Sequence, residues 1–161
     1  MAVSIEWKEL LPWAGTFVAA AVASLIWLAR RKKEAKEFRD AESCLRNGQY
    51  LDCIRHLSKA DEKWAFNVAN STPKTIVRDF DRLIAIVEMI TDAAAKSGIS
   101  LDSEEFLKLL KEARGIASDK SHYKFGTFTL KKEFAAKAGQ LASDISEHRS
   151  DFRAKYSKLL A

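Results

Sequence analysis

Proline, glycine and cysteine are all scarce in this sequence. Two prolines and six glycines among 161 residues are too few for the many turns of a β-sandwich or a β-barrel. Alanine, leucine, lysine and glutamate recur throughout, and all four favour helices. We therefore predict an all-α protein. Its two cysteines, Cys44 and Cys53, are too few for a disulfide framework or a four-ligand zinc site, and we expect buried free thiols.

The usual sequence motifs of enzymes are also missing. There is no glycine-rich phosphate loop, no His-Glu-x-x-His zinc helix and no nucleophile elbow. The three histidines, His56, His122 and His148, lie in separate segments. We expect no enzymatic activity, no catalytic residue, no bound metal and no cofactor. Three scattered aspartates on helical segments are expected to face solvent: Asp40, Asp52 and Asp61.

Charge is absent from one long stretch. Residues 10–29 form 20 consecutive positions without an acidic or basic side chain. A helix of that length covers about 30 Å, the thickness of the hydrocarbon core of a bilayer. Trp13 and Trp27 lie near its two ends, where indole rings favour the membrane interface. We predict a transmembrane helix here.

The flanks of this stretch predict its orientation. Residues 30–33 read Arg-Arg-Lys-Lys, whereas the first nine residues carry one lysine and two glutamates. By the positive-inside rule the N-terminus lies outside and the C-terminal part in the cytoplasm, at a bacterial inner membrane. A cleaved signal peptide is the alternative, because the Ala-Val-Ala at 21–23 has the spacing of a cleavage site, but the apolar run continues to Ala29. We divide the chain into an N-terminal transmembrane anchor, residues 1–33, and a cytoplasmic helical ligand-binding domain, residues 34–161.

Small residues recur every four positions within the predicted span. Gly15, Ala19 and Ala23 form one row, and a second row lies beside it at 16, 20 and 24. Helices pack closely along such rows in lipid, which predicts a homo-oligomer. A monomeric anchor that is merely rich in alanine is the alternative.

Hydrophobic periodicity divides the cytoplasmic domain into a bundle of about five helices. The first continues out of the membrane to Arg46, where Asn47 and Gly48 break it, and the second begins near Gln49. The next begins with Thr72 as its N-cap and a proline in its first turn. The later helices are predicted at 73–97, 102–113 and 130–159, with a loop at 114–129.

The candidate binding site is the basic and aromatic segment that follows residue 119. Seven basic and two acidic residues lie between 106 and 132. Lysines that alternate with hydroxyl, imidazole and aromatic groups can neutralise phosphates and stack bases, as in single-stranded RNA recognition. The start of the helix at 73 could receive a phosphate on free N–H groups. The candidate ligand-binding residues are Thr72, Lys74, Lys120, Ser121, His122, Tyr123 and Lys124. A solvated basic surface is the alternative.

The combination of an N-out membrane helix, a basic linker and a compact helical domain without an active site resembles the small membrane effectors of type III CRISPR antiviral defence. The resemblance covers the whole chain as architecture and assigns no binding residue. It implies that the cytoplasmic domain binds a cyclic oligoadenylate, notably cyclic tetra-adenylate, as its activating ligand. It also implies that a tetramer then perturbs the membrane or opens a pore.

The expected partners are therefore the lipid bilayer, the cyclic oligoadenylate and further copies of the chain, without duplex nucleic acid. The alternative function is a membrane-tethered helical scaffold or adaptor. Such a scaffold would bind a protein partner through the hairpin at Tyr50 or through the long C-terminal helix.

Overall fold

The computed structural model describes residues 7–64 and 72–161, with only the backbone described at 7–23 and at Trp27. The prediction of an all-α protein is confirmed. Five α-helices and one short 3-10 helix make up the described regular structure, in the order α1 (Trp7–Arg46), α2 (Tyr50–Lys63), α3 (Pro73–Lys96), α4 (Glu104–Ser118), η1 (Lys120–His122) and α5 (Lys132–Ser157).

Helices α1 and α2 form an antiparallel hairpin. The predicted break after Arg46 is confirmed, because Gly48 takes a φ of +73°, a left-handed conformation that glycine adopts without a Cβ clash. Phe38 and Ala41 on α1 pack into the core beside Cys53 and Leu57 on α2. Cys53 is buried and Cys44 half-buried, and both are free thiols.

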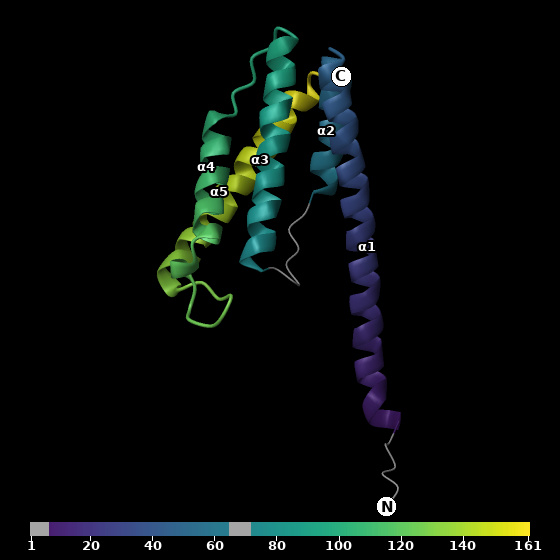
Figure 1. The fold of residues 1–161 in the computed structure, drawn as a ribbon, viewed down its shortest axis with the longest axis vertical. Helices are drawn as coiled ribbons and strands as arrows, with labels where there is room; N and C mark the ends of the chain where they lie inside the picture. The colour runs from purple at the N-terminus through teal and green to yellow at the C-terminus, as the bar shows by residue number, and fades with distance from the viewer. Residues whose placement is uncertain (1–6, 65–71) are drawn as a thin grey trace, which may run out of the picture.

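The predicted span at 10–29 falls within α1, which is one unbroken helix of 40 residues. No helix among the described residues is both long and apolar enough to cross a membrane. The side chains at 10–23 and at Trp27 lie outside the described residues, and so do the rows of small residues up to Ala23. Leu25, Ile26 and Leu28, which are described, are exposed. In Figure 1 the N-terminal half of α1 projects beyond the other helices.

Helix α3 follows its sequence-based prediction closely. Thr72 is its N-cap and forms a reciprocal capping box with Thr75, with Pro73 in the first turn. The buried face of α3 carries Leu83, Val87 and Ile90, which are each at most 1% exposed. This face packs between α2 and α4, so that α3 is the central helix of the domain.

Helix α4 departs from its prediction. It was expected to end near Ala113, but it continues to Ser118. The reason is that Ile116 and Ala117 are buried in the core one turn further on, a contact that outweighs the glycine at 115. Helix α5 begins at Lys132, two residues after its predicted start, and buries Leu141, Ile145, Phe152 and Tyr156.

The expectation that Asp61 faces solvent is wrong. It is 3% exposed, at the end of α2, and accepts hydrogen bonds from Arg149, Arg153 and Tyr156 of α5. Asp40 and Asp52 are half-buried. The ion cluster at Asp61 closes the domain, because it joins the second helix directly to the last.

Candidate functional site

The two segments that the sequence separates by almost 50 residues come together at one cavity. The start of α3 and the connection between α4 and α5 enclose a volume of about 920 Å³. Six of the seven candidate residues line it: Thr72, Lys74, Lys120, Ser121, Tyr123 and Lys124. Figure 1 shows the α4–α5 loop at the end of the molecule toward which the N-terminal half of α1 projects.

The α4–α5 connection is an ordered turn. The carboxylate of Asp119 accepts a hydrogen bond from the Ser121 N–H at 2.8 Å, which caps η1. Hydrogen bonding by the side chain of Ser121, followed by this backbone bond, lowers the pKa of Asp119. Lys124 N donates to Thr129 O at 2.8 Å, and Lys131 N donates to His122 O at 2.9 Å. These bonds close the chain into a hairpin and place the lysines before and after the turn on one cavity.

Gly126 and a pair of facing residues shape the tip of this hairpin. Gly126 has a φ of +68°, which allows the chain to reverse without backbone strain. Tyr123 and Leu130 form an isolated antiparallel bridge. The sequence predicted a loop here, and the structure shows that the loop is held by backbone hydrogen bonds.

His122, the seventh candidate residue, does not line this cavity. Its ring stacks on Phe134 of α5 with ring centroids 3.8 Å apart, and Nδ1 lies 3.1 Å from the carbonyl oxygen of Ile116. One ring face and one ring nitrogen are thus engaged with the helices behind the turn. His122 anchors η1 to α4 and α5.

Tyr123 lines the cavity, while its hydroxyl group contacts α4. Its hydroxyl donates to the carbonyl of Ala117 at 3.0 Å, near the end of α4. Burial raises the pKa of Tyr123, so that the phenol stays neutral. The ring borders the cavity as an apolar wall, while the hydroxyl is committed to a helix end.

Most of the seven basic residues between 106 and 132 either pair with acidic residues or line the cavity, which Lys74 of α3 also lines. Three of the seven face acidic partners away from the cavity: Lys108 lies 3.4 Å from Glu105, Lys111 lies 3.2 Å from Glu88, and Arg114 pairs with Asp81. The lysines that line the cavity have no ion-pair partner within the part of the chain that the structure describes: Lys74, Lys120, Lys124 and Lys131. Lys131 interacts electrostatically with Asp119, and the lysines together carry an excess of positive charge, which favours an anionic ligand.

The helix start contributes less than the sequence suggested. The capping box uses the N–H groups of Thr72 and Thr75, and Pro73 has none. Among the described residues this leaves the N–H of Lys74 in the first turn without a partner. A phosphate here would find one backbone donor together with the lysine side chain.

Two aromatic residues of the cavity wall were not among the candidate ligand-binding residues, although one of them, Phe125, ends the basic and aromatic segment. Phe125 is fully exposed and Phe128 is 69% exposed, and both line the cavity. Apolar residues of this size are normally buried, so their exposure marks them as candidates for contact with a ligand. The sequence offers the signal of two phenylalanines flanking Gly126, but it does not show which aromatics are buried.

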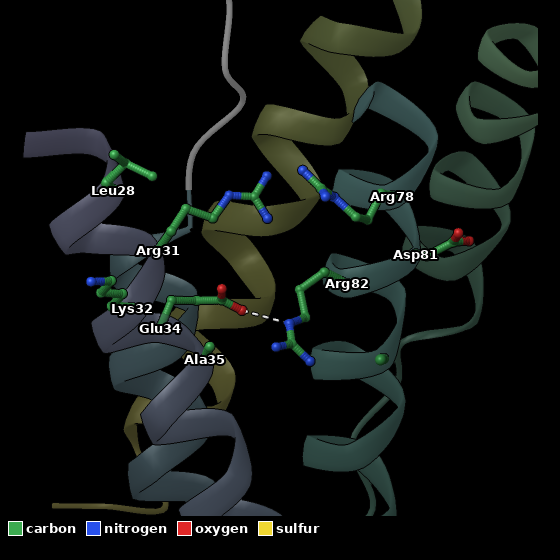
Figure 2. Close-up of a pocket in the computed structure, with 9 residues that line it drawn as sticks. Leu28, Arg31, Lys32, Glu34, Ala35, Arg78, Asp81 and Arg82 are labelled. Atoms are coloured by element: carbon green, nitrogen blue, oxygen red, sulfur yellow. Dashed lines mark ion pairs between the residues drawn. The ribbon is translucent and has the colours of Figure 1, made fainter. Parts of the chain in front are cut away.

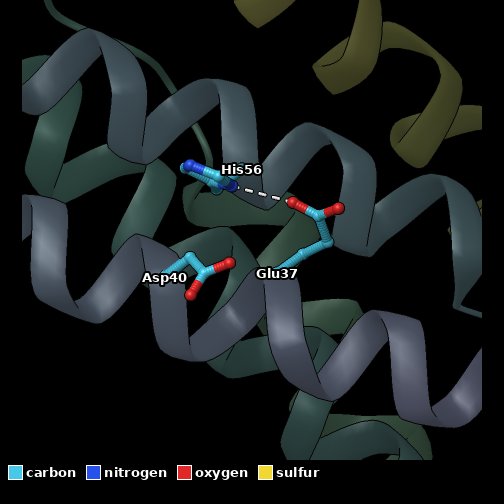
Figure 3. A group of neighbouring side chains, drawn as sticks. All are labelled: Glu37, Asp40 and His56. Carbon is cyan, nitrogen blue, oxygen red and sulfur yellow. Dashed lines mark hydrogen bonds and ion pairs between the residues drawn. The ribbon is translucent and has the colours of Figure 1, made fainter.

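A separate cluster joins α1 to α2, and Figure 3 shows its three side chains. Glu37, Asp40 and His56 bring potential metal-ligand atoms within 4.8 Å of one another. His56 Nδ1 lies 2.8 Å from Glu37, and Lys63 donates to the same carboxylate at 3.1 Å. Burial raises the pKa of Glu37, but the hydrogen bonds from His56 and Lys63 outweigh it and lower the pKa. Lysine already neutralises this carboxylate, so the cluster acts as a link between the helices.

The chemistry of the cavity is that of an anion and nucleobase site. Lysines can bind phosphate oxygens, Ser121 and Thr72 can hydrogen-bond sugar hydroxyls, and exposed phenyl rings can stack on bases. Comparisons with protein-family models, with curated proteins and with solved structures find no match. The geometry of the described residues therefore carries the functional argument.

Proposed function

We propose that this protein is a membrane-anchored antiviral effector whose helical domain binds a cyclic oligoadenylate, with cyclic tetra-adenylate as the first candidate. The proposed binding site is the cavity between the start of α3 and the α4–α5 turn. The observation that carries the proposal is the convergence of two distant basic segments on this cavity.

The size and wall of the cavity suit a nucleotide ligand. Its volume of about 920 Å³ lies in the upper range of ligand pockets. Four lysines without an ion-pair partner among the described residues provide counter-charges for phosphates, and two exposed phenyl rings provide stacking surfaces. A ring of four subunits would present four such sets of lysines to a ligand with repeated phosphates, which makes the site multivalent.

The proposed anchor explains how binding reaches the membrane. The uncharged residues 10–29 lie in the same continuous helix as residues 34–46, which pack on α2. Ligand binding does work only if it favours one arrangement of subunits over another. A rotation or spread of the helical domains would then pass along α1 and perturb the bilayer.

A titration tests the ligand. The full chain in nonionic detergent is titrated by calorimetry with cyclic tri-, tetra- and hexa-adenylate at low and at high salt. We expect binding of one ring size and weaker binding at high salt, because the contacts are phosphate–lysine pairs. Absence of binding by every ring size at low salt overturns the proposal.

A pair of double variants tests the site. Lys120→Gln with Lys124→Gln removes two lysines of the cavity, and affinity should fall by about 100-fold. Lys108→Gln with Lys111→Gln removes the same charge from the same basic stretch, but from lysines paired with Glu105 and Glu88. This control should change affinity by less than about 3-fold. Equal losses in both variants would mean a diffuse charge effect and no defined site.

Cell fractionation tests the anchor. The full chain should stay in the membrane pellet after a carbonate wash, and a tag at the C-terminus should be degraded only when the cytoplasmic side is exposed to protease. Recovery of the intact chain in the supernatant would contradict the membrane part of the proposal while leaving ligand binding open to the titration.

A further inference from the structure

A second cavity lies between α1 and α3, away from the α4–α5 turn. Its volume is about 550 Å³, and its walls carry four basic residues, Arg31, Lys32, Arg78 and Arg82. Figure 2 shows the three arginine side chains reaching into the space between the two helices, with Leu28 at one end and the nitrogen of Lys32 turned away from α3. The cavity begins within three residues of the end of the predicted span.

The cavity exists because α1 packs on α2, and α2 on α3, while α1 and α3 meet mainly through long side chains. Two ion pairs cross the gap. Arg31 of α1 pairs with Asp79 of α3, and Arg82 of α3 lies 2.7 Å from Glu34 of α1. Both carboxylates are at most 3% exposed, so the gap has a polar but well-packed floor.

The charges around the gap do not balance. Asp79 neutralises Arg31, Glu34 neutralises Arg82, and Asp81 is turned to Arg114. Arg78 and Lys32 have no ion-pair partner among the described residues. Burial lowers the pKa of Arg31, and the positive charge of Arg78 lowers it further. In Figure 2 the guanidinium groups of these two arginines point toward one another.

We propose that the cavity binds a phosphate group between the guanidinium groups of Arg31 and Arg78. Guanidinium groups bind phosphate oxygens through paired N–H donors, and an anion between two of them removes their mutual repulsion. Lys32 borders the cavity, but its nitrogen points away from these two arginines, so they are the groups that would bind the phosphate. The phosphate is carried either by an anionic lipid or by a soluble compound.

A lipid source rests on the proposed membrane anchor, whereas the phosphate site itself does not. Arg31 is the second residue after the uncharged stretch, so a span ending at Ala29 would hold the cavity at the level of lipid headgroups. Leu28, exposed at the rim, would lie against the acyl chains. A bound headgroup would then fasten α1 to α3 and fix the angle between the anchor and the domain.

Thermal unfolding of the full chain in nonionic detergent, followed by circular dichroism, tests the site. The additives are dioctanoyl phosphatidylglycerol, dioctanoyl phosphatidylcholine, inorganic phosphate, and sodium chloride at equal ionic strength. Arg78→Gln removes one wall of the site. Lys96→Gln removes the same charge from the opposite end of α3, where the lysine pairs with Asp92 at the surface.

We expect the anionic lipid or inorganic phosphate to raise the melting temperature above that in sodium chloride by about 3 °C or more. The rise should persist in Lys96→Gln and disappear in Arg78→Gln. A rise with phosphatidylglycerol alone identifies a lipid headgroup, and an equal rise with inorganic phosphate identifies a soluble phosphate. The proposal is overturned if no phosphate compound exceeds the salt control, or if Arg78→Gln responds like the parent.

The cyclic tetra-adenylate titration of the same Arg78→Gln protein separates this inference from the proposed function. Arg78 does not line the cavity at the α4–α5 turn, so its replacement should leave that affinity within about 3-fold of the parent. The phosphate site and the proposed function can therefore be contradicted independently of one another.

Discussion

Asp61 at the end of α2 and Arg149 of α5 form a partly buried pair, with Arg149 Nε 2.9 Å from the buried carboxylate. A second nitrogen of Arg149 donates to the main-chain carbonyl of Asp61 at 2.7 Å. The guanidinium also lies over the ring of Trp64, 4.4 Å from its centroid. Arg149 thus contacts the side chain of Asp61, its main-chain carbonyl and the ring of Trp64, and it fixes the end of α2 against α5.

Replacement of Asp61 should be among the most damaging changes in the domain. Asp61→Asn leaves Arg149 and Arg153 without their shared counter-charge in a mostly buried site, at a cost of about 3 kcal/mol in the free energy of unfolding. Asp52→Asn, a matched change at an exposed ion pair with Arg55 on the same helix, should cost under about 0.5 kcal/mol. Urea unfolding of both variants measures the difference. Equal costs would show that the cluster contributes little to stability.

Tyr156 should make the protein sensitive to alkaline pH. Burial, followed by the charge of Asp61, raises the pKa of Tyr156 from 10.0 to about 12. The folded state therefore keeps a proton that the unfolded state loses above pH 10, and stability falls as the pH rises toward 12. The contribution at stake is about 3 kcal/mol for a shift of this size.

Tyr156→Phe supplies the control for this pH dependence. The variant should start from a lower stability, because it loses the hydrogen bond to Asp61 at 3.1 Å. It should then show a shallower decline between pH 10 and 12 in urea unfolding. The same slope in parent and variant would contradict the assignment to Tyr156.

Local sequence signals predicted much of the fold but not the buried ion cluster. The N-cap at Thr72 and the glycine at 48 each act within a few residues, so the helix boundaries that depend on them could be predicted. Asp61 has no local feature that distinguishes it from an exposed aspartate. Its partners lie 88 and 92 residues further along the chain. Its burial is a tertiary effect, as is the extension of α4 through Ile116.

The candidate site was predicted as two separate segments. The sequence could not show that the two segments line one cavity. The sequence prediction chose Lys124 as a candidate residue and left Lys111 in the flanking basic stretch, but it could not show which lysines have acidic partners. The structure separates them, because Lys111 pairs with Glu88 on α3 while Lys124 lines the cavity. In the same way, the sequence grouped His122 with its neighbours, and its stacking on Phe134 depends on the position of α5.

The two cysteines should react at different rates. Cys53 is fully buried, and burial raises its pKa to about 11, which keeps the thiol protonated and unreactive. Cys44 is half-buried and free. With iodoacetamide at about pH 8 the folded chain should be alkylated at Cys44 first, and at Cys53 only after denaturant is added. Peptide mass spectrometry measures both rates, and equal rates in the folded chain would contradict the burial of Cys53.

Phe125 allows a test of the ligand cavity that leaves the fold untouched. Its side chain is fully exposed, so Phe125→Ala removes no core contact and should leave the melting temperature within about 1 °C of the parent. If the ring stacks on an adenine, its loss should weaken cyclic tetra-adenylate binding by about 10-fold or more. Phe134→Ala is the contrasting variant, because that ring packs on His122 and supports η1, and it should lower the melting temperature.

A cyclic oligonucleotide with uracil in place of adenine stacks more weakly and should be affected less by Phe125→Ala. If Phe125→Ala binds cyclic tetra-adenylate as tightly as the parent, the lysines alone recognise the phosphates and the phenyl ring has no part in the site.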